Sequence, residues 1–169
     1  MKAKDKTTAA NVAVVCKSVV EVADIVGSLR LQGKKIVLAN GTFDLLHVGH
    51  IRLLRDAKSR GDYLVVAVNS DASVKKYKNP KLPVQKEDDR IEIISALRGV
   101  DYVFKFNEPT ADSIIAAIKP DIVAKGTDYT PESVPEKETV AEYGGAIAIC
   151  GDKKDHASSK LIDRIKKMK

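Results

Sequence analysis

The sequence predicts an α/β fold, a Rossmann-like doubly wound parallel sheet of about five strands. Two observations predict it. Short apolar runs alternate along the chain with longer segments of helical periodicity, and the 169 residues, 44% of them hydrophobic, suffice for one core. Strands that alternate with helices are joined by right-handed crossovers, so we expect a parallel sheet covered on both faces.

The first elements are marked by a cap and by apolar runs. Ser18 and Glu21 have capping-box spacing and open an apolar-periodic helix that Gly33 ends. Lys35 to Ala39 is a mostly apolar run typical of a buried parallel strand. The expected order is helix 18–31, strand 35–39, loop 40–48, helix 49–60 and strand 63–68.

The second half repeats the alternation after a polar stretch. Residues 75–83 are rich in Lys and Pro, which favours a short helix and a mobile loop. Ile91, Ile94 and Leu97 then share one face of a helix. The expected order is helix 87–97, strand 102–106, helix 110–119, strand 122–124, helix 138–143, strand 146–149 and helix 158–167.

We expect a flexible basic tail over residues 1–17 and a single domain over 18–169. The tail superficially resembles a signal peptide, but no small-residue cleavage site follows it. No apolar run approaches the roughly 18–20 residues that span a bilayer, so we expect a cytoplasmic protein without membrane contact. The net charge is +6, but aromatic residues make up only 5%, so no nucleic-acid partner is expected.

The loop after the first apolar strand carries the residues of greatest chemical interest. His47 and His50 are spaced His-x-Gly-His where the strand gives way to a helix. Free backbone N–H groups and the helix dipole make such a place an anion site. Gly41 and Gly49 lack a Cβ and let a phosphate approach the backbone.

Two imidazoles suit attack on the α-phosphorus of a nucleoside triphosphate, because fixed donors stabilise the charge that develops on the phosphate oxygens. A metal site is the lesser alternative for this spacing, since no third ligand lies close in sequence. Asp44 fits either a cap on the following turn or a substrate contact.

Residues 41–50, Gly-Thr-Phe-Asp-Leu-Leu-His-Val-Gly-His, resemble the motif of the cytidylyltransferase-like nucleotidylyltransferases. Further strings resemble one branch of it, the D-glycero-β-D-manno-heptose 1-phosphate adenylyltransferases, found alone or as the C-terminal half of a bifunctional kinase fusion. This chain looks like the stand-alone form. The branch strings lie at 68–74, 89–90, 100–103, 120–121, 125–129 and 144–145.

The resemblance implies an HxGH nucleotidyltransferase fold and transfer of AMP from ATP to a heptose 1-phosphate, giving ADP-heptose and pyrophosphate. It also implies Mg²⁺ with the ATP, a product that feeds lipopolysaccharide synthesis, and a homodimer.

The resemblance also implies roles for individual residues. His47, His50, Lys75 and Arg90 would be catalytic, although Arg90 would also fit a surface ion pair with Glu87. Asp44, Asn69 and Lys76 would bind the acceptor, and the alternative for each lysine is a solvated surface. Phe43 would also fit the core, and Asp128 a turn cap. The nucleotide contacts would be Gly41, Thr42, Phe43, Gly49, Lys125, Gly126, Asp128, Ser158 and Ser159.

Three departures from the branch pattern bear on the substrate. Thr127 replaces a glycine, and its Cβ would crowd the base or ribose side. Leu82-Pro83 stands where the branch has Arg-Pro, and Ala157 stands where the last helix usually begins with a hydroxyl residue.

The alternative functions follow from these departures. A cytidylyltransferase acting on glycerol 3-phosphate and a guanylyltransferase acting on a related heptose 1-phosphate share the chemistry. A non-catalytic nucleotide-binding module is the alternative of another class. A flavin-binding domain would leave the two histidines without a task.

Overall fold

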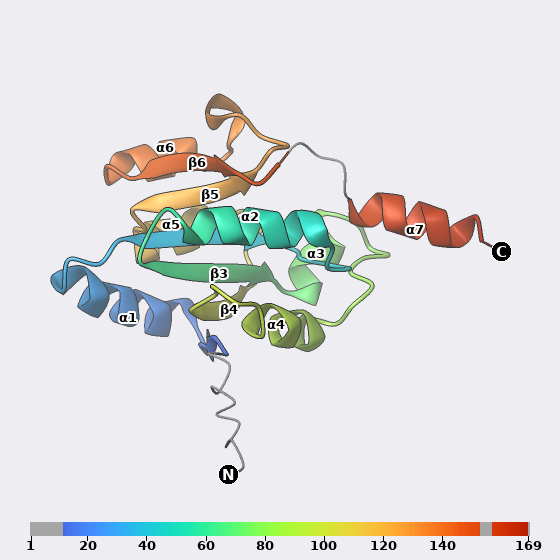
Figure 1. Cartoon of the computed structure of the whole chain (residues 1–169), viewed down its shortest axis with the longest axis horizontal. Helices are drawn as coiled ribbons and strands as arrows, with labels where there is room; N and C mark the ends of the chain where they lie inside the picture. Colours follow the sequence, from blue (N-terminus) through green and yellow to red (C-terminus); the bar gives the residue numbers. More distant parts are fainter. Residues whose placement is uncertain (1–11, 153–156, 169) are drawn as a thin grey trace, which may run out of the picture.

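The computed structural model describes residues 12–152 and 157–168, without the side chain of Ser159. In this part of the chain a six-stranded parallel sheet has the order β1-β4-β3-β2-β5-β6 (Figure 1). The predicted doubly wound α/β fold is confirmed. The strands predicted from apolar runs are β2 (Ile36–Gly41), β3 (Tyr63–Asn69), β4 (Tyr102–Phe106), β5 (Ile122–Gly126) and β6 (Ala146–Cys150).

The strand β1 (Val14–Val15) corrects the predicted tail over residues 1–17. Val14 and Val15 pair in parallel with Tyr102 and Val103 at the edge of the sheet. Their neighbour Cys16 is buried. A strand of two residues is too short for a hydrophobic pattern to reveal it. Residues 1–11 of the predicted tail lie outside the described residues.

Helices cover both faces of the sheet, because the strands alternate their side chains between two cores. Ile36 and Leu38 face the core that α1, α5 and α6 complete, whereas Val37 and Ala39 face the core that α2 and α4 complete. The helices are α1 (Val19–Leu31), α2 (Val48–Lys58), α3 (Asp71–Tyr77), α4 (Glu87–Ser95), α5 (Asp112–Ile118), η1 (Pro131–Ser133), α6 (Lys137–Glu142) and α7 (Ser158–Lys166).

The topology places the loop after β2 at the switch point of the sheet. β2 is followed by β3 on one side, and the chain later returns through α5 to place β5 on the other side. Ligands of open α/β sheets bind where the carboxyl ends of such strands diverge. In Figure 1, α7 projects from this end of the sheet, away from the layers. No helix within the described part is long and apolar enough to cross a bilayer.

Candidate active site

A cavity of about 290 Å³ opens beyond the carboxyl ends of β2, β5 and β6. The cavity therefore lies at the loop after the first predicted strand, where we expected the chemistry. The predicted site residues that line it are Gly41, Thr42, Phe43, His47, Gly49, His50, Gly126, Asp128 and Ser158.

Two stacked imidazoles form one wall of this cavity. His47 is the N-cap of α2 and His50 lies in its first turn. Their ring centroids are 3.9 Å apart with an interplanar angle of 25°. The backbone N–H of His47 donates to Nδ1 of His50 over 3.3 Å. Because Nδ1 accepts, the neutral His50 ring carries its proton on Nε2, which leaves an N–H donor on the other side of the ring.

The pKa of His50 is lowered from 6.5 to about 4, chiefly by burial and also by the neighbouring His47, against the opposing effect of the Asp44 carboxylate. His50 is therefore neutral at pH 7 before any ligand binds. A bound anion favours the charged form of an imidazole, so a phosphate here would raise this pKa.

The loop that carries the histidines has an unusual backbone. Phe43 and Leu45 have φ values of +51° and +44°, in the left-handed region that side chains other than glycine seldom adopt. The Phe43 ring meets the His50 ring edge-on at 5.5 Å. A Cβ at Gly41 would lie 3.2 Å from Cε2 of Phe43, so this glycine makes room for the ring as well as lining the cavity.

Asp44 corrects the prediction of a substrate contact. Its side chain is buried and its carboxylate accepts from the backbone N–H groups of Val84 at 2.7 Å, Gln85 at 2.9 Å and Leu45 at 3.1 Å. These donors occupy both carboxylate oxygens. The turn-capping alternative therefore describes Asp44, which joins the histidine loop to the segment before α4.

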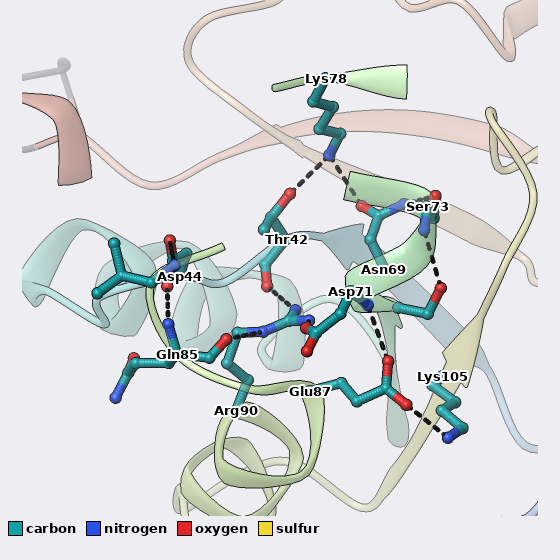
Figure 2. Close-up of polar contacts among 12 residues, drawn as sticks. Thr42, Asp44, Asn69, Asp71, Ser73, Lys78, Gln85, Glu87, Arg90 and Lys105 are labelled. Atoms are coloured by element: carbon teal, nitrogen blue, oxygen red, sulfur yellow. Dashed lines mark hydrogen bonds and ion pairs between the residues drawn. The ribbon is translucent and has the colours of Figure 1, made fainter. Parts of the chain in front are cut away.

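Arg90 does not point toward phosphate as predicted. Its side chain is fully buried, with 0% exposure, and pairs with the Asp71 carboxylate over 2.8 Å. Its guanidinium also donates to the carbonyl of Thr42 and, over 3.1 Å, to that of Gln85 (Figure 2). The alternative ion pair with Glu87 is not formed either, because Glu87 pairs with Lys105 over 2.7 Å. Arg90 is thus a positioning residue that holds Thr42 at the cavity.

Lys78, which the sequence did not single out, lies outside the cavity lining but contacts one of its residues. Its ammonium group donates to Oγ1 of Thr42 over 2.7 Å and to Oδ1 of Asn69 over 2.9 Å (Figure 2). Although the residue as a whole is exposed, burial of the ammonium group lowers the Lys78 pKa, and the nearby charges of Lys125 and Arg90 lower it further. The Lys78 partners seen here are neutral oxygens in a cationic neighbourhood, an arrangement suited to an anion.

The structure does not bring Lys75 and Lys76 to the cavity, where their phosphate and acceptor contacts were predicted. Both residues are exposed on α3, and neither is among the described residues that line the cavity. The Lys76 ammonium instead lies over the Tyr77 ring, 4.9 Å from its centroid.

Asn69, which accepts from Lys78, is itself held by Ser73. The Asn69 side chain is buried, and its amide nitrogen lies 3.4 Å from Oγ of Ser73. Ser73 in turn donates to the carbonyl of Glu108 over 3.0 Å.

Lys125 lies beneath the cavity rather than in its lining. Its ammonium group donates to Oδ1 of Asn40 and to Oε1 of Glu136, each over 2.8 Å, and the side chains of the ion pair are only 6% and 5% exposed. Asn40 itself lines the cavity. The predicted nucleotide contact of Lys125 is therefore corrected to a contact that supports Asn40 at the end of β2.

The start of α7 closes the cavity on the side of the histidine loop. Ser158 lines it and donates from Oγ to the carbonyl of Asp44. The predicted contact of Ser159 concerns a side chain outside the described residues. No group of three or more His, Cys, Asp or Glu side chains that could hold a metal ion occurs in the described part of the chain.

This cavity defines a class of protein: a doubly wound fold that offers two imidazoles and a helix N-terminus to a phosphate chain is built for nucleotidyl transfer. The comparison with known families agrees. The chain belongs to the cytidylyltransferase-like family, whose model matches residues 38–163, and it is a nucleotidyltransferase.

Two curated relatives are similar to most of this chain. The chain is 45% identical over 150 residues to the bifunctional protein HldE of Desulfatibacillum aliphaticivorans, covering 89% of this chain and 31% of that protein. It is also 45% identical over 143 residues to the bifunctional protein HldE of Geobacter metallireducens, covering 85% of this chain and 29% of that protein. The chain thus spans less than a third of the length of either relative.

Two solved structures are similar to this chain in fold. A lipopolysaccharide core biosynthesis protein from Thermoplasma volcanium is similar with a TM-score of 0.61 and 31% identity, covering 72% of this chain and 100% of that chain. A pantoate-β-alanine ligase from Francisella tularensis, solved with β,γ-ATP and β-alanine, has a TM-score of 0.63 at 17% identity, covering 89% of this chain and 73% of that chain. The latter likeness concerns the fold alone.

Proposed function

We propose that the chain is an adenylyltransferase that transfers AMP from ATP to a heptose 1-phosphate, giving ADP-heptose and pyrophosphate. The observation that carries the proposed chemistry is the stacked pair of His47 and His50 at the start of α2 in the switch-point cavity. The similarity to proteins named HldE and to a lipopolysaccharide core biosynthesis protein supports the heptose acceptor.

The proposed reaction is a direct in-line transfer. An oxygen of the acceptor phosphate forms a bond to the α-phosphorus of ATP. The bond from that phosphorus to the bridging oxygen breaks, and pyrophosphate leaves with the electron pair. His47 and His50 would stabilise the charge on the phosphate oxygens, since fixed donors in a half-buried site need no reorganisation.

The acceptor phosphate would lie near Lys78. This ammonium group is fixed by Thr42, which lines the cavity, and by the buried Asn69. A lysine that is partly desolvated gains more from an anion than a solvated lysine does. Lys78 would therefore take the role that the sequence assigned to Lys75 or Lys76.

Mg²⁺ would enter with the triphosphate. The described residues offer no cluster of three metal ligands, but Mg²⁺ commonly binds through substrate phosphates and waters with few protein ligands. Bound in this way it would neutralise part of the triphosphate charge, while His47 and His50 position the α-phosphate.

A substrate panel tests the proposal. Purified protein with Mg²⁺ is given ATP, CTP or GTP together with heptose 1-phosphate or glycerol 3-phosphate, and pyrophosphate release is measured. We expect the fastest release with ATP and heptose 1-phosphate. A preference for CTP with glycerol 3-phosphate, or for GTP, would replace the proposal with one of the alternatives named above. Triphosphate binding without pyrophosphate release from any pair would indicate a non-catalytic module.

A further inference from the structure

The loop after β6 forms a wall of the cavity and is tied at three points. The backbone N–H of Gly151 donates to the Asp56 carboxylate over 2.9 Å. The Asp152 carboxylate pairs with Arg52. The carbonyl of Asp152 accepts from Oγ1 of Thr127 over 2.8 Å. Asp56 and Arg52 belong to α2, whereas Thr127 follows β5 directly.

The Thr127 contact extends the pairing of β5 with β6 beyond its last backbone step. The parallel ladder ends where Gly126 is opposite Cys150. Just past that point, the Thr127 hydroxyl joins the two loops, and both Thr127 and Asp152 line the cavity. A residue without a hydroxyl at position 127 would leave the two segments joined only as far as the last step of the ladder.

Thr127 and Asp152 follow β5 and β6, whereas the two imidazoles belong to the start of α2. The triphosphate is expected at the start of α2, beside His47 and His50. The walls formed by Thr127 and Asp152, at the ends of β5 and β6, then border the rest of the nucleotide.

We propose that Thr127 is a positioning residue that sets the nucleoside side of the cavity by holding the carbonyl of Asp152. This inference rests on the proposed function, because it assumes a nucleoside triphosphate in the cavity. The tie is formed before the ligand arrives, so it spares the nucleotide the cost of ordering that wall. Its loss should weaken binding and leave the chemical step, which occurs at the histidines, unchanged.

The test compares Thr127→Val with Thr127→Ser in the full chain. Valine keeps the branched shape and removes the hydroxyl, whereas serine keeps the hydroxyl. Binding of α,β-methylene-ATP is measured by calorimetry, with kcat and KM for ATP from pyrophosphate release. We expect Thr127→Val to raise Kd and KM about three- to ten-fold, the worth of one neutral hydrogen bond, with kcat within about two-fold. Thr127→Ser should bind within about two-fold of the unchanged protein.

Thr139→Val is the matched control. It also removes a hydroxyl hydrogen bond, to Asp112 over 2.6 Å, but on α6 and remote from the cavity lining. The proposal is overturned by unchanged binding in Thr127→Val, by no rescue in Thr127→Ser, or by an equal loss in Thr139→Val. If the unchanged protein binds the analogue but releases no pyrophosphate with heptose 1-phosphate, the proposed function fails while the binding comparison still decides the role of Thr127. A protein that binds no triphosphate overturns both.

Discussion

Among single residues, His50 is the group on which turnover should depend most. Its Nε2–H lies on the ring side opposite the backbone contact, and the residue lines the cavity. We expect His50→Ala to lower kcat at least about 100-fold, the scale of removing one fixed donor from a transition state. Steady-state pyrophosphate release measures the effect, and circular dichroism checks that the fold is kept. Near-normal turnover in this variant would count against the mechanism.

The pKa of His50 should respond to nucleotide. In the free protein it is lowered to about 4, chiefly by burial. We expect MgATP or its methylene analogue to raise the pKa, because a neighbouring anion favours the imidazolium. NMR titration of the imidazole with and without ligand measures the shift. A pKa that stays near 4 with bound ligand would place the phosphate elsewhere.

The same pKa predicts how folding depends on pH. An unfolded histidine takes up a proton near pH 6.5, whereas His50 in the folded protein does so only near pH 4. Between these values the unfolded state binds more protons, so the free energy of unfolding falls as the pH falls from about 6.5 to about 4. Urea unfolding of the protein and of His50→Asn should show a smaller fall for the variant.

Sequence patterns found the residues of the histidine loop but misjudged several charged side chains nearby. Gly41 ends the buried strand β2, and Thr42, His47 and His50 follow it closely, so local chain order alone brings them to the cavity. The direction of a long side chain is set by contacts far along the chain. Arg90 reaches back to Thr42, 48 positions away, and this contact leaves no local pattern in the sequence.

At the scale of elements, the end of α3 decides which lysine contacts Thr42 in the cavity lining. Lys75 and Lys76 lie in the last turn of the helix, whereas Lys78 is its C-cap and donates to Thr42 and Asn69. Lysines this close together in sequence cannot be distinguished without knowing where the helix ends.

We therefore expect Lys78→Met and Lys75→Met to differ. Lys78→Met removes an ammonium group held beside Thr42 and should lower kcat/KM for the acceptor at least about ten-fold, the worth of one hydrogen bond to a charged group. Lys75→Met, the matched control on the exposed part of α3, should stay within about two-fold. Steady-state kinetics with varied acceptor measures both. Equal losses of kcat/KM in the two variants would contradict a specific role for Lys78.

Arg90 links α4 to the histidine loop and to the start of α3. Arg90→Leu leaves the Asp71 carboxylate and the carbonyls of Thr42 and Gln85 without this partner. We expect it to lower the free energy of unfolding by about 3 kcal/mol, the scale of breaking a buried ion pair. Urea unfolding measures the loss. Arg98→Leu removes an exposed arginine as control, and an equal loss there would contradict this role for Arg90.

At the scale of the whole molecule, the central sheet and its helices could be predicted from the sequence. The edge strand β1 and the contacts between loops around the cavity could not. Short apolar runs predicted β2 to β6 and helical periodicity predicted the main helices. The strand β1 escaped prediction because its valines are about half exposed and pair only at an edge. Thr127 was expected to crowd the nucleotide, and its contact with Asp152 could not be seen before the two loops were placed together.

Deleting α7 should weaken nucleotide binding while leaving the thermal stability of the fold nearly unchanged. Its Leu161 and Ile165 side chains are 39% and 59% exposed, so they contribute little to either core. A chain that ends after Asp152 should keep its Tm within about 4 °C, which corresponds to about 1 kcal/mol. Its nucleotide Kd should rise about ten-fold or more, since the Ser158 side of the cavity is lost.

Differential scanning calorimetry and nucleotide titration measure the two quantities. Ser158→Ala in the full chain is the control and should reproduce most of the affinity loss. A large fall in Tm with unchanged affinity would show that α7 serves the fold rather than the site.

Ser158 reaches the carbonyl of Asp44 across 114 positions of sequence, so the cavity is complete only when α7 has joined the histidine loop. The six strands all precede α7, so under the proposed function the sheet could form while nucleotide affinity still waits on this helix.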